Sequence, residues 1–360
     1  MTGTQQRVAT RDGSRLADWQ GMFAYHDESR WNTLLLGPLW ECAEAAEQAG
    51  CQFRLTREWQ RGPHLRLGVR GPVDAAATVR EQIDRRLHEL LRSTPSTRTV
   101  TLADVRDRAQ QAADRAGVEL CEDWLADNSL TWTAGPPEGT WGTDPEVRAL
   151  LEEFHYAASV PALRLLRAAP ADRLGSALAD LMAVTAQEFG RGGLVSAALS
   201  FRSHAEAYLN LEAAPDARAA WDAAARRSAP ALRRRLLAVA AGTDRPGYVR
   251  DWLEAITPVV RAARQAQSRG EFALPAVADG FSAELTGRSA FHRDLAGSAR
   301  WEEVRSSDWF QTYRFAISLL YLQLSRMGVG PVGRYRLCHL LATALTESED
   351  PTTTTEGGDR

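Results

Sequence analysis

The chain has 360 residues, of which 44% are hydrophobic and 25% are charged. This balance allows a sizeable buried core and excludes disorder over the whole length. The formal net charge of -3 gives no global reason to expect a nucleic acid or an anionic membrane as a partner. All 43 basic residues are arginine, and the lack of lysine excludes a lysine Schiff base, lysine-anchored pyridoxal phosphate and a lysine-containing phosphate loop.

The cysteines and the N-terminal segment exclude further classes. The four cysteines show no CxxC spacing, so the sequence predicts neither a zinc site nor a dithiol. The first residues lack an apolar segment, and no stretch approaches the roughly 18 apolar residues of a membrane span. We therefore expect a cytoplasmic protein without a metal.

The N-terminal part of the chain predicts strands around one helix. Residues 1–15 are polar and are expected to be flexible, and the closely spaced aromatic residues of "DWQGMFAYH" then indicate a first strand. A helix enters at Pro38 and ends at Gly50, a common residue at helix C-termini. Alternation over 51–60 and again over 64–71 predicts two strands joined as a hairpin.

The second strand of this hairpin, "HLRLGVRG", has two faces of different chemistry. One face is apolar and carries Leu65, Leu67 and Val69. The other carries His64, Arg66, Gly68 and Arg70. Because strand side chains alternate, the first set predicts a core face. The second set is either an ordinary solvated face or a row of fixed cations for an anionic or carbonyl-rich substrate, and the pattern allows both.

Helical patterns dominate the remainder. Thr101 and Asp104 form a capping-box-like start of one helix, and Asp144 followed by Pro145 opens another. The acidic, threonine-rich residues 348–360 are expected to be disordered. Strands early and helices later predict an α+β fold: a mainly helical single domain, residues 16–347, with a small early β-sheet.

Two helical segments carry polar groups that could serve chemistry. In "GLVSAALSFRSHAEAYL" the residues at spacings of three and four are Ser196, Ser200, Ser203 and His204. They suit hydrogen bonding to a polar ligand, although small serines also allow close helix packing around an interior histidine. In the mostly apolar "DWFQTYRFAISLLYLQLSRMG", Tyr313 and Tyr321 lie about two turns apart, so both can reach one cavity unless the segment is only a core helix.

Other catalytic arrangements find little support. The chain has no GxSxG motif, and its seven histidines show no metal-ligand spacing. The histidines of "FHYAAS" and "AFHRDL" are interpreted as helix-surface or cap residues. We therefore expect neither a serine hydrolase nor a metal site.

Three segments in order resemble a known family: "RGPHLRLGVRG" after the early strand, "SFRSHAEAYL", and "YRFAISLLYLQLSRMGVGPVGRYRLCHLL". From about residue 19 to 345 the chain resembles the thiopeptide-type bacteriocin biosynthesis proteins, which are related to the elimination domain of class I lanthipeptide dehydratases. The resemblance implies that fold, a ribosomally synthesised precursor peptide as substrate, and no metal or nucleotide. It also implies one of two activities: a lyase that removes glutamate from glutamylated serine, or a pyridine synthase that joins two dehydroalanines.

The sequence departs from the lyase pattern at two places. Gly68 stands where the lyases usually carry a basic residue, and "TDPEVRALLEEFHYAAS" lacks their Tyr-Gly-Gly-like turn. Elimination needs a base and cations for the departing carboxylate, so the resemblance favours the pyridine synthase. We expect a formal [4+2] cycloaddition, then loss of water and of the leader peptide. The alternatives are the lyase and a non-catalytic peptide-binding partner in a complex with other modification enzymes.

The pyridine synthase interpretation assigns roles to individual residues. The predicted catalytic residues are Tyr313, His204, Ser203 and Tyr321. The predicted substrate-binding residues are His64, Arg66, Arg70, Ser200 and Arg202. Arg66 and Arg70 would hold backbone carbonyls or acidic residues of the leader, and Tyr313 or His204 would move protons. The run 233–235 either rims a groove for the leader or is a solvated helix face. The dehydrated, azole-containing core of the peptide would be the reacting partner.

Overall fold

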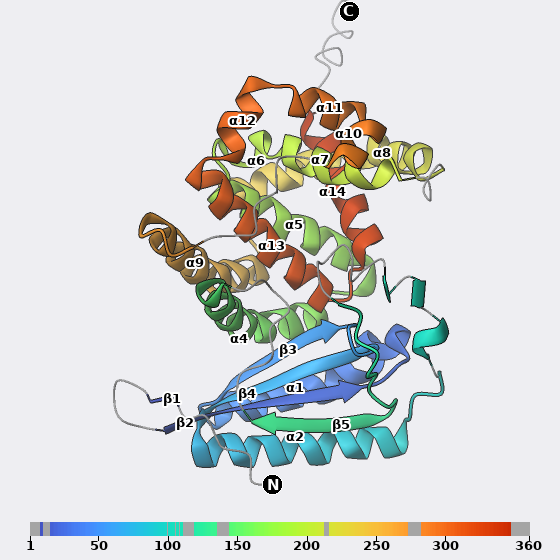
Figure 1. Cartoon of the computed structure of the whole chain (residues 1–360), viewed down its shortest axis with the longest axis vertical. Helices are drawn as coiled ribbons and strands as arrows, with labels where there is room; N and C mark the ends of the chain where they lie inside the picture. Colours follow the sequence, from blue (N-terminus) through green and yellow to red (C-terminus); the bar gives the residue numbers. More distant parts are fainter. Residues whose placement is uncertain are drawn as a thin grey trace, which may run out of the picture. The chain divides into compact units, whose positions relative to one another are not determined.

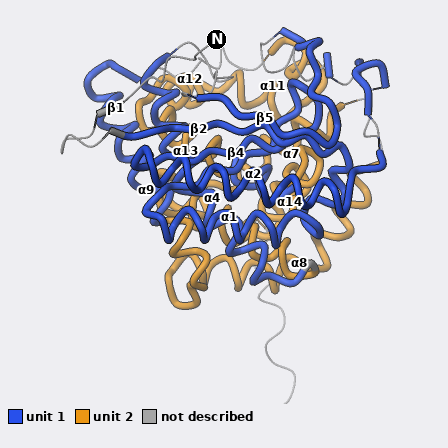
Figure 2. The backbone as a smooth tube through the Cα atoms, turned by 90° about the horizontal axis from the view of Figure 1, so that it is seen from below, with its two compact units in different colours: residues 1–170, 254–274, 322–328 blue, residues 171–253, 275–321, 329–360 orange. Residues whose placement is uncertain are grey.

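The computed structural model of the chain is shown in Figure 1. The residues that it describes are 8–9, 15–98, 100–104, 106–107, 109–110, 119–134, 144–211, 216–272 and 282–346. The chain divides into two compact units, coloured in Figure 2. Unit 1 comprises residues 1–170, 254–274 and 322–328, and unit 2 comprises 171–253, 275–321 and 329–360. The predicted disordered tail lies outside the described residues, as does most of the predicted flexible N-terminus.

Unit 1 is built on an antiparallel sheet. Its strands are β1 (Val8–Ala9), β2 (Arg15–Ala24), β3 (Gln52–Glu58), β4 (His64–Pro72) and β5 (Ser129–Ala134). β4 lies between β2 and β3, which confirms the predicted hairpin, and both β1 and β5 pair with β2. The sequence patterns did not indicate β5, because none of its side chains is fully buried and its place comes from pairing with β2.

Helices lie on both sides of this sheet. Those of unit 1 are the short turns Glu28–Arg30 and Trp31–Leu35, and α1 (Leu36–Gln48), α2 (Val73–Ser93) and α4 (Pro145–Ala168). Figure 1 shows α2 on one side of the sheet and α4 on the other. The predicted core face is confirmed, because Leu65, Leu67 and Val69 are buried in one cluster with apolar residues of α1 and α2.

Helix α4 begins at the predicted cap. The Asp144 carboxylate accepts hydrogen bonds from the backbone N–H groups of Glu146 and Val147, at 2.8 and 3.2 Å. The segments "VRALLEEFHYAAS" and "VPALRLLRAAP", which look like separate helices in the sequence, form the one helix α4, with Pro161 inside it. The result is a long rigid element that carries several polar side chains across the sheet.

Unit 2 is helical. Its helices are α5 (Ala171–Phe189), α6 (Gly193–Ser196), α7 (Ala198–Leu209), α8 (Ala217–Ala241), α10 (Ala283–Arg288), α11 (Ala290–Ala296), α12 (Ala299–Arg305) and α14 (Pro331–Thr346). Helices α9 (Gly247–Ser268) and α13 (Asp308–Arg326) contribute residues to both units. α14 packs against α7 and α8. Early strands followed by helices confirm the predicted mainly helical α+β fold. Within the described ranges, no helix is long and apolar enough to cross a membrane.

Candidate functional site

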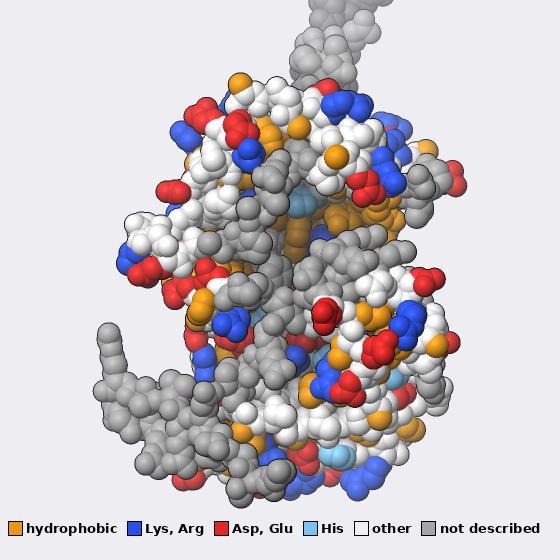
Figure 3. All heavy atoms as spheres, viewed as in Figure 1, with side chains coloured by type: hydrophobic (Ala, Val, Ile, Leu, Met, Phe, Trp, Pro, Cys, Tyr) orange, Lys and Arg blue, Asp and Glu red, His pale blue; other side chains and the backbone are white. Residues whose placement is uncertain are grey.

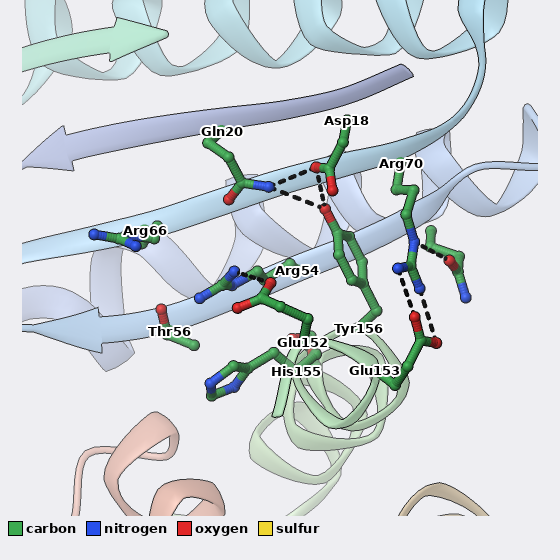
Figure 4. Close-up of polar contacts among 12 residues, drawn as sticks. Asp18, Gln20, Arg54, Thr56, Arg66, Arg70, Glu152, Glu153, His155 and Tyr156 are labelled. Atoms are coloured by element: carbon green, nitrogen blue, oxygen red, sulfur yellow. Dashed lines mark hydrogen bonds and ion pairs between the residues drawn. The ribbon is translucent and has the colours of Figure 1, made fainter. Parts of the chain in front are cut away.

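The second face of the sheet carries polar side chains, and α4 packs over it (Figure 4). The ladder register brings together Asp18, Gln20, Arg54, Thr56, Glu58, His64, Arg66 and Arg70. We call this set the sheet-face network. Of the two sequence interpretations, an ordinary solvated face is wrong, because a helix covers it and most of its charged groups pair with protein groups.

The two arginines of this face that were predicted to bind substrate both have carboxylate partners. Arg70 donates hydrogen bonds to both carboxylate oxygens of Glu153, at 2.6 and 3.0 Å, and its guanidinium lies 4.3 Å from the Tyr156 ring centroid. Arg66 lies 3.2 Å from the Glu58 carboxylate. A role of these arginines in binding substrate stays a prediction, and it would require their guanidinium groups to share these partners.

His64 is buried at the end of the same strand. Its Nδ1 lies 2.8 Å from the carbonyl oxygen of Gly62, and its Nε2 lies 3.8 Å from Glu58. Burial lowers the pKa of His64 below its ordinary value, against the smaller raising effects of this hydrogen bond and of Glu58. The imidazole is therefore a neutral, buried group, and its predicted role in binding substrate stays untested.

Tyr156 of α4 reaches across to β2. Its hydroxyl donates a hydrogen bond of 2.7 Å to Asp18 and accepts one of 3.2 Å from the Gln20 amide (Figure 4). Burial raises the pKa of Asp18, although the hydrogen bonds that its carboxylate accepts from the Tyr156 hydroxyl and from the Gln20 amide lower it. These bonds tie α4 to the sheet, so Tyr156 contributes to the packing of unit 1.

Gly68 provides the space for this contact. An added Cβ at Gly68 would lie 2.8 Å from the Tyr156 hydroxyl and 2.9 Å from the Arg54 Cβ. Both distances are shorter than real Cβ contacts, so a longer side chain would displace Tyr156 or Arg54. The close packing of Tyr156 and Arg54 thus explains why this position has a glycine and not a basic residue.

We expect Gly68→Ala to lower the free energy of unfolding by about 1–3 kcal/mol, because the added methyl group overpacks a closed site. The matched control is Gly175→Ala on α5, where an added Cβ meets nothing within 4 Å. That control should leave stability unchanged or raise it by up to about 1 kcal/mol. Urea unfolding of both variants measures the difference, and equal midpoints would contradict the close approach at Gly68.

Unit 2 brings together the other predicted residues. The His204 and Tyr321 rings meet edge to face, with centroids 5.2 Å apart. The Arg334 guanidinium lies 4.5 Å from the Tyr321 ring centroid, and the Tyr321 hydroxyl and the Cys338 thiol are 3.3 Å apart. With Tyr313, these four residues form what we call the helical cluster.

Tyr313 is the buried member of the predicted pair. It is 4% exposed, and its hydroxyl has no hydrogen-bond partner of good geometry among the described residues. Burial raises the pKa of Tyr313 to about 12, and the nearby Ser200 hydroxyl lowers it by a smaller amount. Tyr313 and Tyr321 lie about two turns apart on the same helix, α13. A buried hydroxyl without a well-aligned partner costs stability, so a ligand that accepted a hydrogen bond from Tyr313 would recover this cost.

His204 is held neutral. Burial lowers the pKa of His204 to about 4, and the positive charges of Arg334, His292 and Arg314 lower it further. A neutral imidazole can accept a proton from a substrate or hold it by a hydrogen bond. His204 thus lies beside Tyr321, while its catalytic role stays a prediction.

The pH dependence of stability follows from this pKa. The unfolded chain protonates His204 near pH 6.5, whereas the folded chain does so only near pH 4. The free energy of unfolding therefore falls as pH drops from about 6.5 towards 4, and this contribution is fully present above pH 6.5. We expect wild type to lose more stability than His204→Gln between pH 7 and pH 5 in urea titrations. Parallel losses would show that His204 has an ordinary pKa.

Ser203 and Arg202 contact residues of α11. Ser203 Oγ lies 3.1 Å from His292 Nε2, while Ser289 Oγ lies 2.8 Å from His292 Nδ1. The Arg202 guanidinium lies 4.9 Å from the Phe291 ring centroid. Their predicted roles stay untested. Of the interpretation of His292 as a surface or cap residue, the surface part is wrong, because the residue is 1% exposed and bridges two serines, while its backbone N–H does donate to the cap residue Ser289 of α11.

His155 was also interpreted as a surface or cap residue, and this is wrong. It is 8% exposed, and its Nδ1 accepts a hydrogen bond of 2.8 Å from Arg326.

In the arginine run 233–235 of α8, Arg233 donates to the Leu345 carbonyl at 3.0 Å, and Arg235 donates to Asp180 at 2.8 and 2.6 Å. Two of these three arginines thus stabilise helices of unit 2.

Three residues of this region were not indicated as site residues by the sequence. Arg334 and Cys338 contact Tyr321 from α14, and Arg314 follows Tyr313 on α13. The quoted segment "GRYRLCHLL" contains two of them, but only the packing of α14 on α7 brings them to His204. Figure 3 shows hydrophobic side chains gathered on one part of the helical unit in this view. Leu199 of α7 and Val332 of α14 are each about half exposed.

Two further features carry no evident chemistry. A cavity of about 410 Å³ between α1 and α2 is lined mainly by alanine and amide side chains, with Asp74 as its one carboxylate. Among the residues that the structure describes, no group of His, Cys, Asp or Glu side chains is placed to hold a metal ion. The helical cluster is therefore the best candidate for chemistry in unit 2.

Residues 19–345 match the family model described as lantibiotic biosynthesis dehydratase C-term. The chain belongs to this family. The assignment confirms the resemblance found from the three sequence segments, over the same range. Search of curated protein sequences finds no match to the chain.

Two solved structures resemble this member of the lantibiotic dehydratase C-terminal family. "Pyridine synthase, TbtD, from thiomuracin biosynthesis" is 26% identical, with a TM-score of 0.68 over 91% of this chain and 97% of that chain. The structure titled "Crystal structure of TsrL" is 20% identical, with a TM-score of 0.62 over 92% of this chain and 94% of that chain. The likeness to TsrL shows the fold, and in both comparisons the match covers more than nine-tenths of each chain.

Proposed function

We propose that this protein is a thiopeptide pyridine synthase that acts on a ribosomally synthesised precursor peptide and needs no metal or nucleotide. The observation that carries the proposal is its 26% identity with the pyridine synthase TbtD across almost the whole of both chains. The closed space at Gly68 supports it, because the lyase alternative is associated with a basic side chain at this position.

In the proposed reaction, the first step is tautomerisation of the peptide bond that precedes one dehydroalanine. The amide N–H loses its proton and the carbonyl oxygen gains one, which produces a 2-azadiene. This step needs an acceptor and a donor rather than a strong nucleophile. The neutral imidazole of His204 is a suitable acceptor, and the unpaired hydroxyl of Tyr313 is a suitable donor.

The azadiene then adds to the second dehydroalanine, and two new bonds close a six-membered ring. Holding the two partners together removes several kcal/mol of the entropic barrier. Loss of the former carbonyl oxygen as water, and of the leader as a carboxamide, leaves the aromatic pyridine. The sequence of steps is redox-neutral, so it needs no oxidant. Tyr313 and Tyr321 would supply and recover protons in these eliminations.

Mass spectrometry tests the proposal. The purified protein is incubated with a linear precursor peptide that contains azoles and dehydroalanines, without added cofactor. We expect a macrocycle that has lost water, together with a leader fragment ending in a carboxamide. Release of glutamate from a glutamylated peptide would instead identify the lyase. Peptide binding without turnover, unchanged when Tyr313 and His204 are both replaced by alanine, would identify a non-catalytic partner.

A further inference from the structure

Two arginines beside the helical cluster lack an acidic partner. Among the residues that the structure describes, neither Arg314 nor Arg334 forms an ion pair. Arg314 donates one hydrogen bond of 3.1 Å to the Gln311 amide oxygen. Arg334 donates one long bond of 3.4 Å to the Tyr335 hydroxyl, and its Nε is buried without a partner. Most donors of both guanidinium groups are therefore left for another acceptor.

Two carboxylates on the neighbouring helices α7 and α8 have other partners. Glu206 of α7 accepts two hydrogen bonds from Arg218, at 3.1 and 2.7 Å. Asp222 of α8 lies 2.9 Å from His339 Nε2. Neither carboxylate therefore neutralises Arg314 or Arg334.

Both arginines are placed beside Tyr321. The Arg334 guanidinium lies over the Tyr321 ring, which contacts His204. Arg314 lies two helical turns before Tyr321, on the same face of α13. Both positive charges also lower the pKa of His204. Excess positive charge in a partly buried place is costly unless an anion compensates it. Guanidinium groups match a carboxylate well, because their planar donors can bind both of its oxygens. A bound carboxylate would thus supply the missing negative charge.

We propose that Arg314 and Arg334 form a subsite for one carboxylate of the peptide substrate, next to His204 and Tyr321. That the carboxylate belongs to a peptide substrate rests on the proposed function. That the two arginines bind a carboxylate does not. The carboxylate comes either from an acidic side chain or from a free C-terminus of the peptide. In both cases it would fix the register of the peptide relative to the polar groups of the helical cluster.

The subsite can be tested without turnover, by NMR titration of the ring signals of His204 in histidine-labelled protein. The probes are N-acetylglutamic acid α-amide, which has one carboxylate, and N-acetylglutamine α-amide, its neutral isostere. We expect saturable shifts with the glutamic acid probe and none with the glutamine probe. Two short peptides separate the sources: Ac-Glu-Ala-Ala-NH2 carries a side-chain carboxylate, and Ac-Ala-Ala-Gln-OH carries a C-terminal one.

Matched variants make the result specific. Combined Arg314→Gln and Arg334→Gln should weaken binding of the acidic probe by roughly tenfold or more. Arg336→Gln, an exposed arginine on the same helix as Arg334, should bind like wild type. Equal shifts with both probes, or unchanged binding in the double variant with intact circular dichroism, would overturn the subsite. Because no pyridine formation is measured, that outcome is distinct from failure of the proposed function.

Discussion

Tyr313→Phe is expected to lower kcat for pyridine formation by about 10²–10⁴, the range typical of losing a general acid or base. The same change should leave the free energy of unfolding unchanged or raise it by about 1 kcal/mol. The reason is that the Tyr313 hydroxyl is buried without a good hydrogen-bond partner, so its removal relieves a desolvation cost. Stopped assays by mass spectrometry and urea unfolding measure the two effects on the same preparation.

A second tyrosine of unit 2 provides the control. Tyr248 donates a hydrogen bond to the fully buried Asp180, which also accepts from Arg235. Tyr248→Phe should therefore destabilise the protein by about 1–2 kcal/mol and leave kcat close to wild type. A loss of stability with normal turnover in Tyr313→Phe would show that Tyr313 is only a packing residue.

The sheet shows what the sequence could and could not predict. Strict alternation in "HLRLGVRG" predicted the core face correctly, because the side-chain period of a strand is a local property. What covers the other face is decided by α4, which lies about 80 residues later in the chain. From the sequence, Arg70 is therefore interpreted as a cation that binds substrate, while the structure pairs it with Glu153. Gly68 is interpreted as a position that lacks the basic residue of the lyases, while the structure shows that Tyr156 fills the space there.

The helical cluster shows the same limit in unit 2. The spacing of Tyr313 and Tyr321 on one helix predicted that they share a face, because helix periodicity is local. The approach of His204 was expected only from the family resemblance. Cys338 was missed, because a lone cysteine in an apolar stretch usually fills space. Burial raises its pKa to about 11, so it is a neutral thiol beside Tyr321 rather than a nucleophile.

Arg326→Met is expected to have the largest effect on stability in unit 1. Arg326 is 2% exposed, and its Nε donates a hydrogen bond of 2.6 Å to the Leu55 carbonyl of β3. It also donates to His155 Nδ1 at 2.8 Å and to the Gln323 amide oxygen. Methionine would fill the space but remove the donor to His155 Nδ1 and to the Gln323 amide oxygen. Of its two side-chain donors, the Leu55 carbonyl would keep only the Ser159 hydroxyl, in a weaker bond of 3.3 Å. We expect a loss of about 3–5 kcal/mol in the free energy of unfolding, measured with urea.

Burial makes Arg326 an unusual cation, because it lowers the pKa of the guanidinium to about 9. Arg326 therefore stabilises the fold through its directed hydrogen bonds more than through its charge. Arg326→Lys tests this, because lysine keeps the charge but loses the planar set of donors, and it should recover less than half of the loss. Arg85→Met, at an exposed position of α2, should change stability by no more than about 0.5 kcal/mol. A loss below about 1 kcal/mol in Arg326→Met would mean that water or neighbouring donors satisfy β3 and α4 without this side chain.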